Sequence, residues 1–213
     1  MKLFLLLRSI ISTLWLACAI LLALSSCGGA LLLAGAPPSA MQWRDADSLC
    51  QWYSQTNLNS IASVSGWNCT AAGKALSVPC VPGAATWTGV ACVAQYSTGY
   101  VTGIKLVGKG ITGRLTGSLG NISTMTSIEV DKNSLTGPIP SEWFTSTNML
   151  AKISLSNNQL SGAFPTQITK LTTLTSFSSI YNYKISGTFP IDWSPLANLQ
   201  YCEISYMNVT GTP

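Results

Sequence analysis

Five glycines recur along the second half of the chain at intervals of 24, 25, 25 and 24 residues. Each follows an apolar residue and a hydroxyl residue, and three of them have a proline three positions later. A fixed period of this length indicates a solenoid, because one turn cannot bury its apolar edge without a neighbouring turn. The repeating glycines are Gly113, Gly137, Gly162, Gly187 and Gly211.

A second apolar pattern precedes each glycine. Three apolar residues at alternating or near-alternating positions predict one short strand whose side chains point inward. In the fourth set the last residue stands one position late, which predicts an extra residue and a β-bulge. Cys202 fills an inward position, which predicts a buried thiol. The sets are Val101, Ile104, Leu106; Met125, Ile128, Val130; Leu150, Ile153, Leu155; Leu174, Phe177, Ile180; and Leu199, Cys202, Ile204.

Asparagines stand where the chain leaves two of these strands. The amides of Asn133 and Asn158 can point inward and satisfy backbone groups of the adjacent turn. Lys109, Tyr183 and Met207 occupy the corresponding positions of the other repeats. We therefore expect a ladder of buried amides that is continuous only across the middle turns.

Cysteine usage indicates an exported protein. Cys50, Cys69, Cys80 and Cys92 lie in one stretch, without a CxxC pair and in a chain without histidine. This pattern favours two disulfides over a zinc site. Three pairings are open, of which we favour the sequential one, Cys50–Cys69 and Cys80–Cys92.

The first 40 residues predict a secretory signal peptide or a signal anchor. Basic Lys2 and Arg8 flank the start of an apolar segment that continues to about residue 36. Either reading exports the chain after Pro37 and leaves a membrane association open. Leu24–Cys27 also resembles a bacterial lipobox. The sequons at Asn68, Asn121 and Asn208 predict glycosylation in a eukaryotic host.

Composition excludes several function classes. Only 8% of the residues are charged and the net charge is +4, so a basic surface for nucleic acid is not expected. We find no nucleophile–base pair, metal set or phosphate loop, so we expect no enzyme activity and no cofactor. Glu129 and Asp131 could suggest paired catalytic carboxylates, but Lys105, Lys132 and Lys152 favour a solvated ion-pair cluster.

Residues 150–165 fit the template L-x-x-L-x-L-x-x-N-x-L-x-G-x-[IF]-P, and a W-x-G-V-x-C motif ends at Cys92. The chain thereby resembles the plant-type leucine-rich repeats of receptor-like kinases, polygalacturonase-inhibiting proteins and kinetoplastid surface antigens. The resemblance implies an α/β solenoid, a right-handed arc with short parallel strands on its concave face. It also implies a small helical, disulfide-bonded cap at residues 41–100, with a helix opening at Asp47. Aromatic residues in such a cap usually form its core, which is what we expect of Trp52, Trp67 and Trp87, with a glycan-stacking surface as the alternative. About four and a half repeats would follow at residues 101–213, truncated before a closing cap.

The resemblance places the ligand surface on the concave face. Such a module binds an extracellular protein, peptide or glycan at the cell surface, as a receptor ectodomain or as a non-signalling coat or adhesion glycoprotein. Tyrosine is a frequent interface anchor, which favours Tyr181, Tyr201 and Tyr206 as contacts, with ordinary solvated strand residues as the alternative. The predicted ligand contacts on this face are Lys105, Glu129, Asp131, Lys152, Ser154, Tyr181, Tyr201, Glu203 and Tyr206. The other residues expected to point into solvent there are Gly103, Val107, Ser127, Ser156, Ser176 and Ser205.

Overall fold

The computed structural model describes residues 40–80, 87–95, 98–145 and 148–211. The chain divides into two compact units, residues 1–34 and 35–213, and the fold below belongs to the second. The predicted signal peptide or anchor lies outside the described residues except for its last position. No helix within the described ranges has both the length and the apolar character needed to cross a membrane. The domain boundaries at residues 40 and 100 remain predictions.

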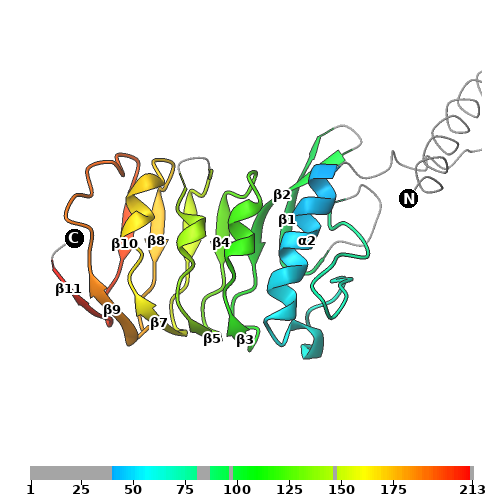
Figure 1. The fold of residues 1–213 in the computed structure, drawn as a ribbon, viewed down its shortest axis with the longest axis horizontal. Helices are drawn as coiled ribbons and strands as arrows, with labels where there is room; N and C mark the ends of the chain where they lie inside the picture. Colours follow the sequence, from blue (N-terminus) through cyan, green and yellow to red (C-terminus); the bar gives the residue numbers. More distant parts are fainter. Residues whose placement is uncertain (1–39, 81–86, 96–97, 146–147, 212–213) are drawn as a thin grey trace, which may run out of the picture. The chain divides into compact units, whose positions relative to one another are not determined.

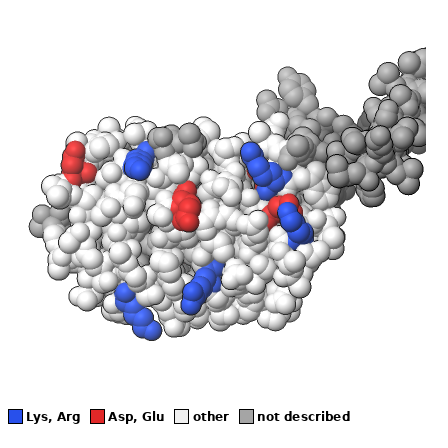
Figure 2. Space-filling view, in the orientation of Figure 1, with Lys and Arg blue, Asp and Glu red and all other residues white. Residues whose placement is uncertain are grey.

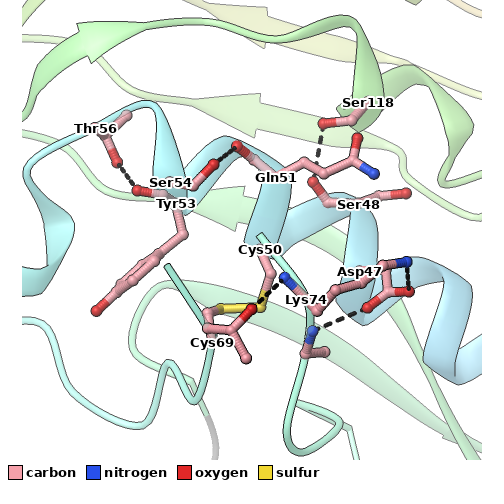
Figure 3. Close-up of a disulfide and its surroundings, with 12 residues drawn as sticks. Asp47, Ser48, Cys50, Gln51, Tyr53, Ser54, Thr56, Cys69, Lys74 and Ser118 are labelled. Atoms are coloured by element: carbon pink, nitrogen blue, oxygen red, sulfur yellow. Dashed lines mark hydrogen bonds and ion pairs between the residues drawn. A yellow bond between two sulfur atoms is a disulfide. The ribbon is translucent and has the colours of Figure 1, made fainter. Parts of the chain in front are cut away.

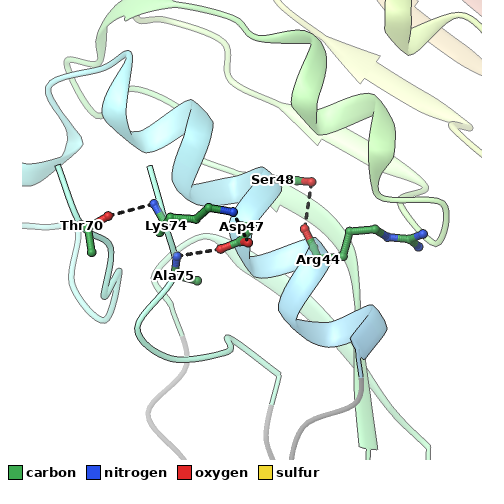
Figure 4. Close-up of polar contacts among 6 residues, drawn as sticks. All are labelled: Arg44, Asp47, Ser48, Thr70, Lys74 and Ala75. Carbon is green, nitrogen blue, oxygen red and sulfur yellow. Dashed lines mark hydrogen bonds and ion pairs between the residues drawn. The ribbon is translucent and has the colours of Figure 1, made fainter. Parts of the chain in front are cut away.

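The cap consists of α2 (Ala40–Ser54), the 3-10 helix η1 (Leu58–Ser60) and β1 (Val90–Gln95). The helix begins at Ala40, so the predicted start at Asp47 was wrong. Asp47 does not cap the helix. Its carboxylate accepts hydrogen bonds from the Ala75 amide at 2.9 Å and from Lys74 Nζ at 3.0 Å, which ties the following loop to the helix (Figure 4).

The cap core is aromatic and cross-linked. Trp52, Trp67 and Trp87 are buried, as predicted, and the ring of Trp67 contacts each of the other two. Disulfides join Cys50 to Cys69 and Cys80 to Cys92, which confirms the sequential pairing. The first of them links α2 to the loop before Lys74 (Figure 3). Cross-links of this kind stabilise a small core mainly by restricting the unfolded chain.

The repeats stack side by side from the cap toward β10 and β11 (Figure 1). Each repeat contributes one strand to each of two sheets, and the strands between repeats are parallel. The six-stranded sheet has the order β1-β2-β4-β6-β8-β10, with β1 antiparallel to β2. Its other strands are β2 (Thr98–Lys105), β4 (Ser127–Glu129), β6 (Lys152–Ser154), β8 (Ser176–Ser178) and β10 (Tyr201–Glu203).

A second, five-stranded sheet carries the repeating glycines or the residues beside them. Its order is β11-β9-β7-β5-β3, again parallel. The strands are β3 (Thr112–Arg114), β5 (Ser134–Gly137), β7 (Gln159–Ala163), β9 (Lys184–Thr188) and β11 (Asn208–Thr210). Short 3-10 helices connect the sheets at η2 (Gly117–Asn121), η3 (Ser141–Trp143) and η4 (Thr166–Lys170).

The inward side chains of the first three repeats are buried, as the apolar pattern predicted. The fourth repeat differs from the prediction. Its strand pairs residue for residue with β6, Ile153 opposite Phe177, so there is no bulge. Ser179, not Ile180, takes the third inward position and is fully buried. Its hydroxyl accepts a hydrogen bond from Asn182 Nδ2 at 3.3 Å, which compensates its burial.

The amide ladder therefore extends one repeat further than predicted. Asn133 accepts hydrogen bonds from the Lys109 and Ile111 amides, and Asn158 accepts one from the Leu135 amide. Asn182 is buried and accepts one from Leu160 N at 3.0 Å. Assigning Tyr183 to this position was wrong, because the supposed extra residue shifted the alignment by one.

Cys202 is the other correction. It occupies the inward position on β10, yet it is exposed rather than buried. An inward side chain in a solenoid is covered by the turns on both sides. Among the described strands of its sheet, β10 pairs only with β8, so Cys202 has a covering turn on one side alone.

Asp45 is the buried carboxylate of the cap. It lies on α2, and neither of its carboxylate oxygens has a hydrogen-bond partner among the described residues. Burial raises the pKa of Asp45 from 3.8 to about 6, against the opposing influence of the Arg44 charge.

Candidate functional site

The solvent side of the six-stranded sheet, hereafter the strand face, arranges its side chains in rows. Parallel pairing in register places the last residue of each strand beside its counterpart in the next repeat. Because side chains alternate along a strand, these residues face solvent while their neighbours face the core. The central row is Lys105, Glu129, Ser154, Ser178 and Glu203.

Hydrogen bonds connect the second to fifth repeats across the strand face. Asp131 Oδ1 accepts from Ser154 Oγ at 2.6 Å and from the Ser156 amide at 2.9 Å. The hydroxyls of Ser156 and Ser178 are hydrogen-bonded to each other, and Ser178 donates a long bond of 3.4 Å to Glu203 Oε2. The carboxylates at the two ends of this chain are thus connected through serines, which fixes their positions before any ligand arrives.

The cations of this face lie on β2 and β6 and in the turn after β4. Lys152 Nζ is 2.7 Å from Glu129 Oε2, one of two ion pairs among the described residues. Lys105 and Lys132 join no ion pair within that part of the chain, so the predicted cluster is a single pair. Glu203 likewise has no Lys or Arg within ion-pair distance among the described residues.

Tyrosines gather at the other end of the strand face. The rings of Tyr181 and Tyr206 are stacked, with centroids 4.5 Å apart and planes 15° apart. Tyr183 lies beside them with its centroid 6.2 Å from that of Tyr181. Tyr201, Tyr183 and Tyr206 are 48%, 66% and 57% exposed, so these rings are not part of the core.

Glu203 is coupled to these phenols. A hydrogen bond to Glu203 is the main cause that raises the pKa of Tyr201. The pKa of Tyr181 is raised chiefly by Tyr206, with a smaller contribution from Glu203. The carboxylate therefore lies among the tyrosines and faces the same solvent as they do.

A shallow hollow with a volume of about 480 Å³ lies in the strand face. Asp131, Lys152, Ser178, Tyr201 and Glu203 are among its lining residues. A second hollow of about 580 Å³ lies beside Pro138, Phe164 and Thr188, where Glu142 is its one titratable lining residue. Of these two hollows, only the first joins two carboxylates, the cations of Lys132 and Lys152 and one aromatic ring, that of Tyr201, from several repeats. Elsewhere, charged side chains are few, as the face in Figure 2 shows.

Solved structures resemble this arrangement. The BIR2 ectodomain from Arabidopsis thaliana superposes with a TM-score of 0.62 at 22% identity, over 83% of this chain and 84% of that one. A chain of the BIR3–SERK2 complex from the same plant gives 0.60 at 24% identity, over 78% and 84%. The HAESA receptor kinase ectodomain, solved with an IDA peptide hormone, gives 0.51 at 20% identity, over 81% and 30%. No family model matches the chain.

The fold is that of a leucine-rich-repeat solenoid. It confirms the predicted α/β solenoid with a disulfide-bonded cap. The strand face corresponds to the inner, concave side on which the sequence placed the ligand surface. Sequence identities of this size establish the fold, while the ligand of this leucine-rich-repeat chain has to be argued from its own residues.

The three sequons lie off the strand face. Asn68 is in the cap, Asn121 ends η2 and Asn208 begins β11 of the second sheet. All three are exposed. Their glycosylation remains a prediction.

Sequence reasoning identified most of this face and missed two members of it. All nine predicted residues belong to the strand face or the turns that follow its strands. Ser178 was missed because the supposed bulge displaced it, and Tyr183 because it was assigned to the ladder. Ser156 contributes through its hydroxyl although it is buried. The spacing of Asn133, Asn158 and Asn182 could have corrected the register.

Proposed function

We propose that this chain is an extracellular recognition module that binds a protein or peptide segment on its strand face. The observation that carries the proposal is the preorganised polar chain from Asp131 to Glu203, which ends in exposed tyrosines. Side chains held in place before binding lose little conformational entropy when a ligand arrives. Exposed tyrosines are frequent anchors at such interfaces.

Two further observations support an extracellular receptor role. Two disulfides in a cap of this size are typical of an oxidising compartment. The HAESA ectodomain structure contains a peptide hormone, and the BIR3–SERK2 structure is a complex of two proteins. We extend this kind of partner to the present chain, as the ectodomain of a membrane receptor.

The test is a selection of displayed random peptides against the full chain, expressed in a secretory host. Peptides that bind are then measured on Ser154→Arg, which places a bulky cation in the middle of the strand face. We expect binding to weaken by tenfold or more. Gln167→Arg is the matched control, because it adds the same side chain at an exposed position of η4.

Thermal melting of both variants verifies that they remain folded. Peptides that bind Ser154→Arg as well as the parent protein would overturn the proposal, as would a loss of binding confined to Gln167→Arg.

A further inference from the structure

Two tyrosines occupy backbone positions that disfavour them. In every repeat, a residue of positive φ follows the strand of the six-stranded sheet. In the second and third repeats this residue is Lys132 (56°) and Asn157 (55°). The first repeat has Gly108, which adopts this conformation without strain. Tyr181 and Tyr206 have φ of 58° and 59°, a conformation that is rare for bulky residues. Core packing does not require Tyr206 there, because its side chain is 57% exposed, whereas Tyr181 is half-buried.

The strained backbone places the two rings in one stack. Tyr181 and Tyr206 stand one repeat apart, and only this shared turn position brings them to a centroid separation of 4.5 Å. Strained, exposed residues that cluster in this way point to a functional role. A stacked pair of phenols presents aromatic faces and edges to a ligand.

Glu203 supplies the charge beside this stack. It follows Tyr201 on β10 by two residues, so both side chains point to the strand face. From the neighbouring strand β8, one described side chain donates to the Glu203 carboxylate. It is Ser178, whose hydrogen bond is long. Without a Lys or Arg partner among the described residues, the carboxylate is free to bind an external cation.

The carboxylate without a Lys or Arg partner lies at the tyrosine end of the strand face. Lys105 lies on β2, four strands from Glu203, which is roughly 19 Å at ordinary strand spacing. Lys152 is already paired with Glu129. Lys132 and Lys152 line the same hollow as Glu203, but neither forms an ion pair with it, so the tyrosine end carries an unpaired carboxylate beside aromatic surface.

We propose that Glu203, Tyr201 and the stacked Tyr181–Tyr206 pair form a recognition pocket for an arginine side chain of the partner. A guanidinium is planar, donates in a fork that fits a carboxylate and stacks on aromatic rings. A neutral glycan would use the rings but would leave the carboxylate charge unpaired. The pocket deepens the proposed function and rests on it, since the arginine belongs to the bound protein or peptide.

The probe is Nα-acetyl-arginine methylamide, titrated into the full chain while amide NMR signals of β8 and β10 are followed. Nα-acetyl-citrulline methylamide is the matched control, because its side chain has nearly the same shape without charge. We expect saturable shifts around residues 176–206 with the arginine compound and at least fivefold weaker binding of the citrulline compound.

Variants identify the groups involved. Glu203→Gln and Tyr206→Ala should each weaken binding of the arginine compound at least threefold. Glu142→Gln, which removes an exposed carboxylate on η3, should leave it unchanged. Since Glu203→Gln keeps the size of the side chain, unfolding is not expected, and a melting curve verifies this.

Several outcomes would overturn the pocket. These are equal binding of both compounds, no effect of Glu203→Gln, or shifts with a neutral oligosaccharide in place of the arginine compound. If selected peptides bind the strand face without any dependence on Glu203, the pocket is wrong and the proposed function stands. If the arginine compound binds but the binding of no peptide depends on Ser154, the proposed function is wrong and the pocket stands.

Discussion

Asp45 is unusual at the residue scale, because it places a carboxylate in the cap core without a hydrogen-bond donor among the described residues. Desolvation favours the neutral acid, and Arg44 only partly opposes this effect on the pKa. The cap therefore contains a group whose charge state in the folded chain differs from that in the unfolded chain across mildly acidic pH.

This difference predicts the pH dependence of stability. The pKa of Asp45 is about 6 in the folded chain against 3.8 as its ordinary value, so the folded chain binds more protons in between. The contribution of Asp45 to the free energy of unfolding is fully present below pH 4. It is lost as the pH rises through 6, which lowers the free energy of unfolding by about 2 kcal/mol or less. Urea denaturation at pH 4 and pH 7 should show this loss in the parent chain and not in Asp45→Asn.

Asp192→Asn is the control for this comparison. Asp192 is exposed and its pKa is lowered by hydrogen bonds from Ser194, so its removal should not abolish the loss of stability toward neutral pH. Equal pH dependence in the parent chain and Asp45→Asn would contradict the prediction.

At the scale of elements, the junction between the cap and the first repeat depends on close backbone approach. Gly113 on β3 forms a bridge with Thr56, and the Arg114 amide donates to the Gln55 carbonyl at 3.1 Å. A Cβ on Gly113 would lie 2.0 Å from the Gln55 oxygen. Gly187 has nearly the same φ, 100° against 101°, but its nearest neighbour would be 3.7 Å from the added atom.

Substituting Gly113 and Gly187 separates the steric cost of an added Cβ from the conformational cost of positive φ. Both Gly113→Ala and Gly187→Ala impose the strain of positive φ, about 1 kcal/mol each. Only Gly113→Ala also forces the cap away from β3, so we expect it to cost at least about 2 kcal/mol more. Chemical denaturation of the two variants measures the difference, and equal losses would show that the junction tolerates an added methyl group.

At the scale of the whole chain, a stack of repeats transmits stability mainly between neighbours. The cap covers one end of the six-stranded sheet, where β1 pairs with β2. Disturbing the cap should therefore affect the nearest repeats most and the distant ones least.

The double variant Cys50→Ala/Cys69→Ala tests this gradient. Loss of the bridge should destabilise the cap by about 3 kcal/mol. Hydrogen exchange followed by mass spectrometry should show faster exchange in β2 and β4 than in the parent, with little change in β8 and β9. Cys202→Ser, at the far end, is the control and should spare β2. A uniform increase along the chain would mean that all repeats unfold as one cooperative unit.

The sequence by itself determined the solenoid, the cap, its disulfides and most of the strand face. Each of these follows from local regularities: the spacing of glycines, the apolar positions between them and the four clustered cysteines. Apolar periodicity is local information, because a side chain is buried or exposed according to its position in a single turn.

Only the tertiary structure decided the fourth repeat, the exposure of Cys202 and the tyrosine stack. Pairing with β6 places Ser179 inward where the apolar pattern favoured Ile180, and Asn182 then satisfies its hydroxyl. Tyr181 and Tyr206 are far apart in sequence and meet because successive turns repeat the same backbone conformation. Contacts between turns depend on register, and register is fixed by hydrogen bonds to neighbouring strands rather than by composition.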